Sequence, residues 1–434
     1  MEQVEQLGQP VNWHRARGAG ANPRASAAPP TAAPALDSAS RPPPGPEPLQ
    51  TEMLVLQPTP FCNLDCSYCY LPQRGRRARM APATARWAAR HLRDEGLLGS
   101  ELTVVWHAGE PMVLPPAYYE EAFAAVAEGL GAGAGSPRPG ALRLTHALQT
   151  NGTLLDEAWC DFLQRHRVAI GLSVDGPAAL HDRHRRTRRG AGTHAAVARA
   201  IARLQARGLP FHAIAVVTAD TLADPDAFYD WFEAQGITAL GCNIDEAEGP
   251  HAASSLAGRA GGPDPDSAPA AFIARLLERS RRGRVVVREL AAAWQGLRQP
   301  PPGGREAPHN PQTRPLAIVS VAHDGGFSTF SPELLGQPEP AWGGFVLGNV
   351  HHGGYRQALQ REPFTGLWRE IAAGVDACER RCPWFALCGG GAPVNKWYEH
   401  GSFAATETLY CRSMVQRPLA AVLRQAEIDL GLAA

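Results

Sequence analysis

The chain lacks an excess of charge of either sign. Lys and Arg together number 42, and Asp and Glu together number 42, in 434 residues. A balanced chain has no overall electric field that would draw it to nucleic acid or to an anionic membrane. We therefore expect neither nucleic acid nor membrane among its partners, although this count leaves local charged patches open.

Long apolar runs are also missing. The chain contains no uninterrupted apolar stretch of about 18 residues, the length that a transmembrane helix needs. Its first residues, MEQVEQLGQPVNWHRARGAG, lack the apolar core of a signal peptide. These absences predict a cytoplasmic protein. Residues 1–50 are rich in Ala, Pro, Gly and Ser without hydrophobic periodicity, so we expect a disordered tail there.

Cysteine is scarce, with nine residues, and unevenly placed. In a cytoplasmic chain, clustered thiols favour metal ligation over a disulfide framework. Cys160 and Cys242 stand alone and are expected to be small buried apolar side chains. The other seven form an early group and a late group: Cys62, Cys66 and Cys69, then Cys378, Cys382, Cys388 and Cys411.

From Leu54 onward, short apolar runs alternate with Ala- and Arg-rich stretches of helical spacing. This alternation predicts an α/β fold with parallel strands and right-handed crossovers. Six such units are too few for a closed eightfold barrel, so we expect a partial (β/α)6 barrel. The apolar runs lie at 54–59, 102–107, 142–149, 168–174, 211–218 and 239–244.

The chain after these units reads differently. A Gly/Pro/Ser-rich loop is expected over 249–268, helix over 270–298 and a second loop over 299–314. The segment LAIVSVAHDGGFSTF predicts a β-hairpin with Asp324, Gly325 and Gly326 at its turn. We place a domain boundary near residue 300, giving domains over 51–300 and 301–434.

The early cysteines follow the first expected strand with the spacing C-x3-C-x2-C. Thiolates are the usual protein ligands of iron–sulfur clusters. Three thiolates on a four-iron, four-sulfur (4Fe-4S) cube leave one iron free, and catalytic metal sites need such an open position. A zinc site would need a fourth nearby ligand, which the segment does not offer.

With Tyr68 before the third cysteine, this segment resembles the radical S-adenosylmethionine (radical SAM) superfamily. The sequence WHAGEP at 106–111 resembles the family's GGEP motif, with Ala108 in place of the first glycine. QTNG at 149–152 and SVDGP at 173–177 resemble the motifs that end the third and fourth strands. Each alone reads as a turn. Together they lie at successive strand ends, where such barrels gather their active sites.

The resemblance implies that S-adenosylmethionine occupies the open iron and is cleaved to a 5′-deoxyadenosyl radical. It places the backbone at Gly109 and the Glu110 carboxylate against the methionine amino group, and the absence of a Cβ at Gly109 suits close approach. It places Ser173 and Arg185 at the ribose or carboxylate, and Tyr68 near the adenine. The full set of cosubstrate contacts that it implies is Tyr68, Gly109, Glu110, Asn151, Ser173, Asp175 and Arg185.

The late cysteines, with CGGG at 388–391, resemble the SPASM extension of peptide-modifying radical SAM enzymes. Four thiolates fully ligate one 4Fe-4S cluster, which suits electron transfer or structure; a structural zinc stays open as an alternative. Anaerobic sulfatase-maturating enzymes hold two auxiliary clusters, with further cysteines around the hairpin and after the glycines. Here Ala392 follows the glycines and no cysteine lies between Cys242 and Cys378. One auxiliary cluster is expected. The catalytic aspartate of sulfatase maturation also has no counterpart in the SPEL segment.

Three segments resemble a smaller group, the GrrM-type maturases that form cyclophanes in ribosomally made peptides: QPTPFCNLDCSYCYLP, CNIDEAEG, and STFSPELLG with CGGGAPVNKWYEHG. This implies a precursor-peptide substrate, an electron donor such as flavodoxin or ferredoxin, and a carbon–carbon bond between an aromatic ring and a Cβ. The ring must lose a proton. The candidate bases are Asp245, Glu246, Glu248 and Glu333; the alternative is that they are solvated loop carboxylates.

Two other functions stay open. One is oxidation of a Ser or Cys to formylglycine, as in sulfatase maturation, or another peptide oxidation. The other is an iron–sulfur or zinc protein with no chemistry of its own. The basic run 181–189 either contacts an acidic leader peptide or, apart from Arg185, forms a solvated loop. No peptide-binding winged-helix module is expected before the barrel.

Overall fold

One curved sheet organises the chain. The computed structural model describes residues 49–131, 142–258, 267–298 and 309–433. The expected tail, except for residues 49 and 50, and the expected boundary near residue 300 lie outside these residues. The described strands form a single sheet in the order β10-β9-β8-β1-β2-β3-β4-β5-β6-β7. The strands are β1 Thr51–Leu56, β2 Leu98–Trp106, β3 Arg143–Thr150, β4 Ala169–Ser173, β5 Phe211–Val217, β6 Ala239–Ile244, β7 Val286–Val287, β8 Ile318–Val321, β9 Gly326–Thr329 and β10 Gly348–Asn349.

Strands β1 to β7 run parallel, as the alternation of runs predicted. Side chains alternate between the two faces of the sheet because a strand repeats every two residues. In β1, Leu54 and Leu56 join the large core under the helices. Met53 and Val55 point to the opposite face, where they pack with Ile318 of β8. The side chains on the concave face of the sheet therefore form a cluster distinct from the core between the sheet and the helices.

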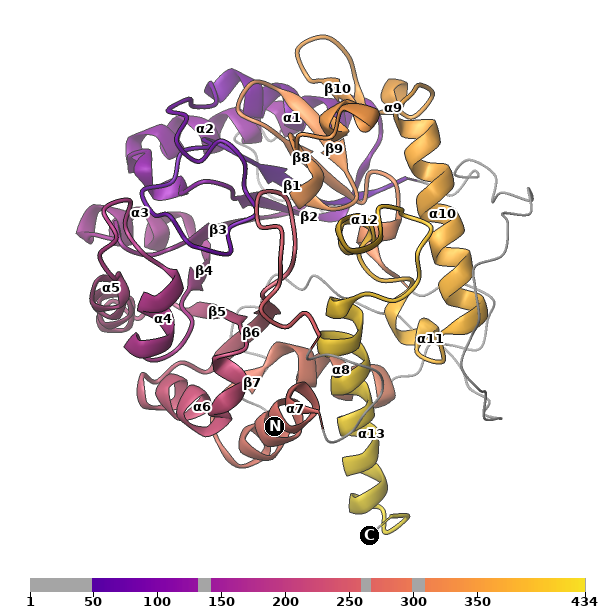
Figure 1. Ribbon diagram of the computed structural model, residues 1–434. Coiled ribbons are helices and arrows are strands. Elements are labelled where there is room, and N and C mark those ends of the chain that lie inside the picture. The colour runs from indigo at the N-terminus through magenta and orange to yellow at the C-terminus, as the bar shows by residue number, and fades with distance from the viewer. Residues whose placement is uncertain (1–48, 132–141, 259–266, 299–308, 434) are drawn as a thin grey trace.

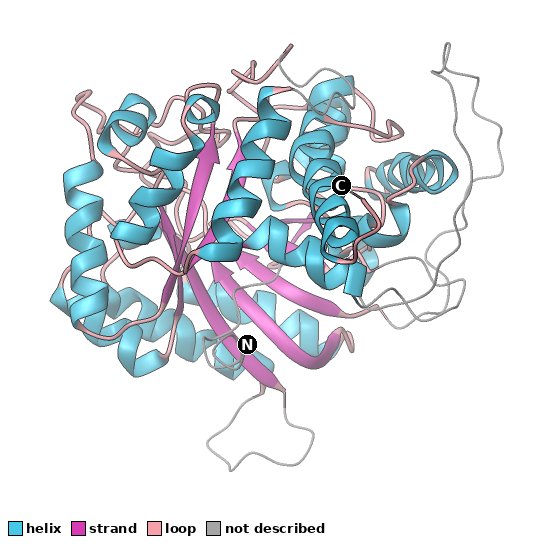
Figure 2. Cartoon of the chain, turned by 90° about the horizontal axis from the view of Figure 1, so that it is seen from below, coloured by secondary structure: helices cyan, strands magenta, loops and turns pink. Residues whose placement is uncertain are grey.

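Helices cover the convex side of the sheet, so that the arrangement is an open barrel (Figures 1 and 2). Proline opens α2, and Gly131 in the left-handed region ends it, which is the usual asymmetry of helix ends. Asp156 caps α3 by accepting a hydrogen bond from the Trp159 amide at 2.9 Å. The helices of this layer are α1 Pro82–Asp94, α2 Pro116–Leu130, α3 Glu157–His166, α4 Ala178–His184, α5 His194–Ala206, α6 Pro225–Ala234, α7 Ala268–Arg282 and α8 Arg288–Arg298.

The expected helical segment over 270–298 is wrong in one respect. It consists of α7 and α8 separated by the short strand β7. Gly283 ends α7 at a crowded point, where a Cβ would lie 2.4 Å from the hydroxyl oxygen of Tyr229. The two valines of β7 then pair with β6. Because β-branched residues suit an extended backbone, the sheet gains a seventh parallel strand that the helical periodicity had concealed.

The expected hairpin is present, with β8 and β9 antiparallel. Strand β8 also pairs in parallel with β1, matching Leu56 to Val321. The hairpin therefore extends the barrel sheet from its first strand. Residues after the hairpin build a second, aromatic-rich core that includes Phe330, Phe364 and Phe403. The helices there are α9 Tyr355–Ala358, α10 Phe364–Arg381, α11 Phe385–Cys388, α12 Pro393–His400 and α13 Arg417–Asp429, with a π-helical turn over Cys411–Gln416 before α13.

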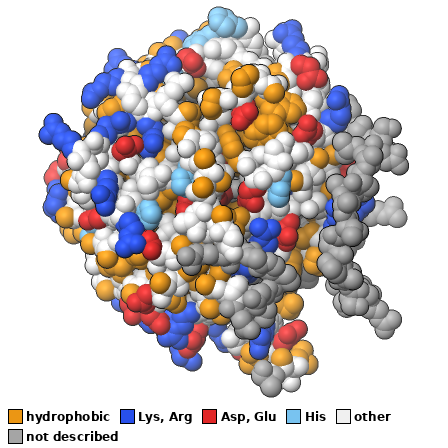
Figure 3. Space-filling model, viewed as in Figure 1, with side chains coloured by type: hydrophobic (Ala, Val, Ile, Leu, Met, Phe, Trp, Pro, Cys, Tyr) orange, Lys and Arg blue, Asp and Glu red, His pale blue; other side chains and the backbone are white. Residues whose placement is uncertain are grey.

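The molecular surface shows no single-sign face in the view of Figure 3, where basic and acidic side chains are interspersed. This agrees with the equal totals of basic and acidic residues. No helix in the described residues is both long enough and apolar enough to cross a membrane.

Candidate active site

A cavity of about 350 Å³ lies where the parallel strands end. The carboxyl ends of parallel strands are the usual place for ligands in open α/β folds. The early cysteines Cys62, Cys66 and Cys69 line this cavity, and so do Cys388 and Cys411 of the late group. Two segments more than 300 residues apart in the sequence thus face one chamber.

The early cysteines lie in the loop between β1 and α1, and all three are free thiols at partly buried positions. The loop is held by local contacts: the Leu64 amide donates to the Cys62 sulfur at 3.4 Å. Burial, with the nearby charges of Glu110, Cys66 and Cys69, raises the pKa of Cys62 to about 12. Burial likewise raises the pKa of Cys66 to about 11. These groups are therefore protonated thiols at neutral pH without a metal, and a bound metal cluster would stabilise them as thiolates.

The kind of metal centre follows from ligand spacing. In the described part of the chain, no group of three or more His, Cys, Asp or Glu side chains is placed to hold a single metal ion. Ligands of a four-iron cube bind separate iron atoms, and they therefore stand further apart than ligands of one zinc ion. The early cysteines interact electrostatically, and in the described part of the chain they do not form a single-ion site. Such an arrangement is compatible with a cube whose corners are held by separate thiolates.

The AGEP turn supplies a buried carboxylate beside the early cysteines. Glu110 is 1% exposed and accepts three hydrogen bonds: from the Met112 amide at 2.9 Å, the Thr150 hydroxyl at 2.6 Å and the Asn151 amide at 2.7 Å. Burial raises the pKa of Glu110 despite these donors. The carboxylate has no cationic partner among the described residues, and it lines the cavity. Such a group fits a ligand that carries an ammonium group.

Contacts within the protein explain why residue 109 is a glycine. Its φ is +59°, and a Cβ there would lie 2.5 Å from the carbonyl oxygens of both Thr59 and Phe61. The Glu110 amide donates to the same Phe61 carbonyl at 2.9 Å. We expected the missing Cβ to admit the cosubstrate. The structure shows that it admits the backbone of the cysteine loop. Ala108 takes a φ of +72°, so the alanine occupies a left-handed position that glycine would adopt without strain.

Gly109→Ala is expected to destabilise the protein by about 2 kcal/mol more than Gly96→Ala, because overpacking adds to the backbone strain. Gly96 is the matched control: its φ is +64°, but a Cβ there meets no atom within 4 Å. Urea unfolding of both variants measures the difference in free energy. Equal losses of stability would show that the Cβ at position 109 meets no rigid backbone.

The segment after β4 forms a buried ion pair. Asp175 is 2% exposed, and Arg185 donates to its two carboxylate oxygens at 2.9 Å and 3.0 Å. Tyr68 donates its hydroxyl hydrogen to the same carboxylate, and the Arg185 guanidinium lies 5.4 Å from the Tyr68 ring centre. The three residues thus connect the cysteine loop to the fourth strand.

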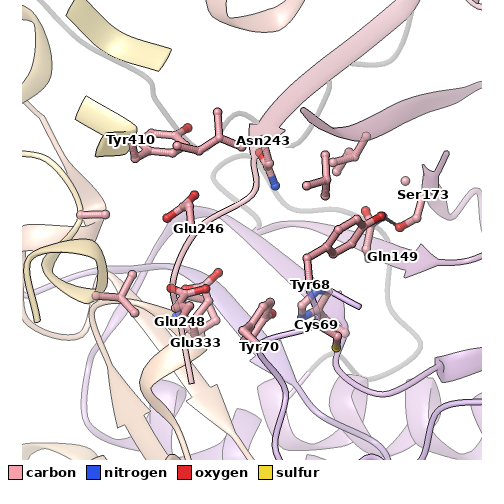
Figure 4. A pocket seen from close by; sticks show the side chains of 18 of the residues that line it. Tyr68, Cys69, Tyr70, Gln149, Ser173, Asn243, Glu246, Glu248, Glu333 and Tyr410 are labelled. Atoms are coloured by element: carbon pink, nitrogen blue, oxygen red, sulfur yellow. Dashed lines mark hydrogen bonds between the residues drawn. The ribbon is translucent and has the colours of Figure 1, made fainter. Parts of the chain in front are cut away.

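Ser173 and Asn151 are also held by partners within the protein. The Gln149 amide donates to the Ser173 hydroxyl at 3.0 Å, as the dashed line in Figure 4 marks. The Asn151 amide donates to the Asn63 side chain at 2.9 Å and approaches the Cys62 sulfur at 3.9 Å. Asn63 also donates to Thr153 at 2.9 Å. Asn63 therefore ties the cysteine loop to the end of β3, a role that its place between two cysteines does not reveal.

The basic run is not a solvated loop throughout, because some of its side chains contact the cysteine loop. Arg188 donates from Nε to the Cys62 carbonyl at 2.8 Å, and it also donates to the Arg74 carbonyl. Arg74 in turn donates to the Cys66 carbonyl at 3.0 Å. His184 meets the Ser67 hydroxyl at 2.8 Å. Residues of the run thus hold the cysteine loop, because its exposed carbonyls need donors.

The late cysteines come together at the ends of short elements. Cys378 is in the last turn of α10, Cys382 follows it, Cys388 ends α11 and Cys411 begins the π-helical turn. Burial raises the pKa of Cys388 to about 11, and charges on Cys382 and Cys378 add to this. Burial also raises the pKa of Cys411 to about 12, with Cys388 and Cys382 adding to it. Cys388 therefore lies near Cys378 and Cys382, and Cys411 lies near Cys382 and Cys388, so that the four thiols form one connected group.

The glycine run after Cys388 has a conformational reason. Gly389, Gly390 and Gly391 have φ values of +69°, +103° and +72°, which side chains with a Cβ rarely adopt. In this conformation the amides of Gly390 and Gly391 donate toward the Cys388 sulfur and lower its pKa. Successive amides aimed at one anion form a concave binding surface for it. The CGGG sequence thus suits a thiolate at position 388.

The four candidate bases separate into two kinds. Asp245 is engaged on both oxygens, by His251 at 2.6 Å and by the Ser255 amide at 2.7 Å. All four line the cavity, and Glu246, Glu248 and Glu333 lie together in it, next to Tyr70 (Figure 4). Burial raises the pKa of Glu248 well above its usual range, and the charges of Glu246 and Glu333 add to this effect. Burial, and after it the charge of Glu333, raises the pKa of Glu246 well above its usual range.

The two isolated cysteines, Cys160 and Cys242, are fully buried apolar side chains, as expected. The contributions of Asn63 and Arg188 were not anticipated from the sequence, because each depends on a partner far along the chain.

Known proteins give independent information on the chain. The profile of the Radical SAM superfamily matches residues 56–232. The "Uncharacterized protein sll1766" of Synechocystis sp. is 36% identical over 398 residues, which span 88% of this chain and 94% of that protein. The serine-type anaerobic sulfatase-maturating enzyme of Klebsiella aerogenes is 32% identical over 195 residues, spanning 44% of this chain and 46% of that enzyme.

Among solved structures, "Native anSMEcpe with bound AdoMet and Cp18Cys peptide" is similar with a TM-score of 0.67 and 20% identity. The match covers 88% of this chain and 98% of that chain. At this level of identity the likeness concerns the fold, and it extends across both the barrel and the C-terminal region.

Proposed function

The chain belongs to the radical SAM superfamily and is a radical SAM enzyme, and from that premise we propose that it is a maturase of a ribosomally synthesised peptide. In the proposed reaction, the Cβ of one residue is joined to the aromatic ring of a nearby residue, forming a cyclophane. One related solved structure contains AdoMet and a peptide together, which supports a peptide as the substrate class. The GrrM-type resemblance supports the crosslink.

The single observation that carries the proposal is the shared cavity. It is lined by the early cysteines, by the carboxyl groups of Glu246, Glu248 and Glu333, and by cysteines of the late group. When bound at the early cysteines, the cluster and S-adenosylmethionine would supply a carbon radical able to remove a hydrogen atom. Cys62, Cys66 and Cys69 would hold that cluster, and Glu110 would meet the cosubstrate's ammonium group. Cys378, Cys382, Cys388 and Cys411 would hold the auxiliary 4Fe-4S cluster.

The crosslink removes two hydrogens from the peptide. One would leave the Cβ as a hydrogen atom, and the bound cosubstrate would supply the radical that takes it up. The other would leave the ring as a proton accepted by a carboxylate, and a cluster held by the late cysteines would supply an acceptor for the remaining electron. Glu246, Glu248 and Glu333 are the better-placed bases, since both oxygens of Asp245 are already hydrogen-bonded. Their raised pKa values bring proton acceptance closer to neutral pH.

The second candidate is oxidation of Ser or Cys to formylglycine. Its support is the identity with the Klebsiella aerogenes enzyme over 44% of this chain. Against it stand the absence of cysteines between Cys242 and Cys378 and the lack of a counterpart to that family's catalytic aspartate. Ser oxidation and crosslinking both remove two hydrogens, so the mass of the product does not separate them. A hydrazide distinguishes the two products, because it reacts with the aldehyde of the oxidation product.

The test uses the reduced holoenzyme, S-adenosylmethionine and the short peptides encoded beside its gene. We expect a product two hydrogens lighter that resists fragmentation between the joined residues and does not react with hydrazide. In the same assay, Glu248→Gln is expected to slow crosslinking by about 10²- to 10⁴-fold, the usual contribution of a general base. Asp245→Asn is the matched control and should change the rate little. Formation of a hydrazone would show that the product is an aldehyde, so that the reaction would be the oxidation and not the crosslink. Parental rates in the Glu246, Glu248 and Glu333 amide variants would exclude all three as the base.

A further inference from the structure

Lysine is almost absent from this protein. Of the 42 Lys and Arg residues, 41 are arginine, and Lys396 is the only lysine in the chain. It lies on α12 and is 3% exposed. A fully buried lysine is uncommon unless its charge is paired. The one basic residue that is a lysine and not an arginine is therefore a buried amine.

The partner of Lys396 is a cysteine of the late group. Its Nζ donates to the Cys378 sulfur at 3.5 Å. Among the described residues, no carboxylate forms an ion pair with Lys396. Room for the amine comes from Gly374, where a Cβ would lie 3.1 Å from Nζ and 2.1 Å from the Phe403 carbonyl oxygen. An ammonium group buried without a counter-charge is costly. A thiolate at Cys378 supplies that counter-charge.

The early cysteines lack such a contact. Arg185 and Arg74 lie near Cys66 and oppose the rise in its pKa, but both are paired with carboxylates, Arg185 with Asp175 and Arg74 with Asp65. Arg188 donates to the Cys62 carbonyl and not to its sulfur, and the Glu110 carboxylate places a negative charge near Cys62. Among the described residues, a cationic side chain hydrogen-bonds to a cysteine sulfur only at Cys378.

Reduction potentials of iron–sulfur clusters depend on the net charge around them and on hydrogen bonds to their sulfurs. Reduction adds one negative charge, and a nearby positive charge stabilises the reduced state more than the oxidised state. We propose that Lys396 is a positioning residue that raises the reduction potential of the cluster held by the four late cysteines, so that this cluster accepts the electron leaving the peptide. The inference rests on the proposed auxiliary cluster.

The experiment uses the full chain with Cys62, Cys66 and Cys69 replaced by alanine, so that only the late group binds iron and sulfide. In this background, K396M removes the charge and K396R keeps it. R424M removes one positive charge from an exposed position on α13 and is the matched control. Iron and sulfide are counted for each protein, and the potential is measured by redox titration followed by electron paramagnetic resonance.

We expect K396M to lower the potential enough to change the equilibrium constant for one-electron reduction at least tenfold, a shift of 59 mV. K396R should restore most of the difference, and R424M should leave the potential at the parental value. If K396M does not bind iron, K396Q replaces it. A potential in K396M equal to that in R424M would overturn the role of Lys396 while leaving the auxiliary cluster in place.

Two other outcomes also overturn the inference, and each indicates a different explanation. If the background protein binds no iron or sulfide, the auxiliary cluster itself is absent, and the proposed electron acceptor fails with it. If both uncharged variants lose the cluster while K396R retains it, Lys396 holds the ligand set together and does not tune its potential.

Discussion

Replacing Cys62, Cys66 and Cys69 with alanine is expected to reduce cleavage of S-adenosylmethionine by at least about a thousandfold, a modest part of the acceleration that enzymes typically give. The physical reason is that an open iron exists only while three thiolates hold the remaining corners of the cube. Their crowding in one partly buried loop makes a cationic centre the natural occupant. The measurement is 5′-deoxyadenosine formed under anoxic conditions with a chemical reductant.

The control for this prediction is Cys160→Ala, which removes a fully buried thiol on α3 that does not line the cavity. It should retain the parental rate of cleavage and the parental iron content. The triple variant should lose only the iron of the early cluster and keep that of the late group. If the triple variant cleaved S-adenosylmethionine as fast as the parent, the early cysteines would not hold the catalytic cluster, and the proposed function would fail with them.

The second large effect is expected at the buried pair of Asp175 and Arg185. Their side chains are 3% and 9% exposed, so removing one partner leaves the other charge without water or counter-ion. Arg185→Met is therefore expected to lower the free energy of unfolding by about 3–5 kcal/mol. It should also weaken S-adenosylmethionine binding, because Tyr68 donates to the carboxylate that Arg185 orients. Urea unfolding and equilibrium binding measure the two effects.

The pH dependence of this variant has a definite sign. Burial raises the pKa of Asp175, but the charge and hydrogen bonds of Arg185 outweigh burial and hold it below its usual value. In the parent, this group therefore stabilises the fold above its unfolded pKa, and the contribution is lost as the pH falls through the lowered folded pKa. In Arg185→Met the two Arg185 contributions that lower the pKa of Asp175 are gone, and only the weaker influences of His181 and Tyr68 oppose burial. The pKa of Asp175 therefore rises, and its protonation relieves the buried charge.

The stability gap between the parent and Arg185→Met should consequently narrow as the pH is lowered from neutral. Arg143→Met is the control, because Arg143 pairs with Glu101 at the surface with both side chains more than half exposed. Surface pairs contribute about 0–1 kcal/mol, and that variant should show no comparable narrowing. A gap of constant size at all pH values would contradict an uncompensated Asp175 charge.

The local patterns in the sequence were sufficient for the parallel strands, the hairpin and the two cysteine groups. Strand and helix periodicities depend on near neighbours, and the C-x3-C-x2-C spacing places three thiols in one loop whatever surrounds it. They were not sufficient for β7, since the helical pattern on both sides concealed two valines. They also misassigned the reason for Gly109, whose Cβ is excluded by Thr59 and Phe61.

By itself, the sequence determined six parallel strands in chain order, the two groups of cysteines and the glycines that follow Cys388. Only the tertiary structure decided which distant residues meet. It brought Glu333 after the hairpin beside Glu246 and Glu248 after β6, and it set the lone lysine against Cys378. The physical reason is that such pairs depend on how β8 docks against β1 and how α12 packs on α10, and these contacts are set by the burial of whole surfaces.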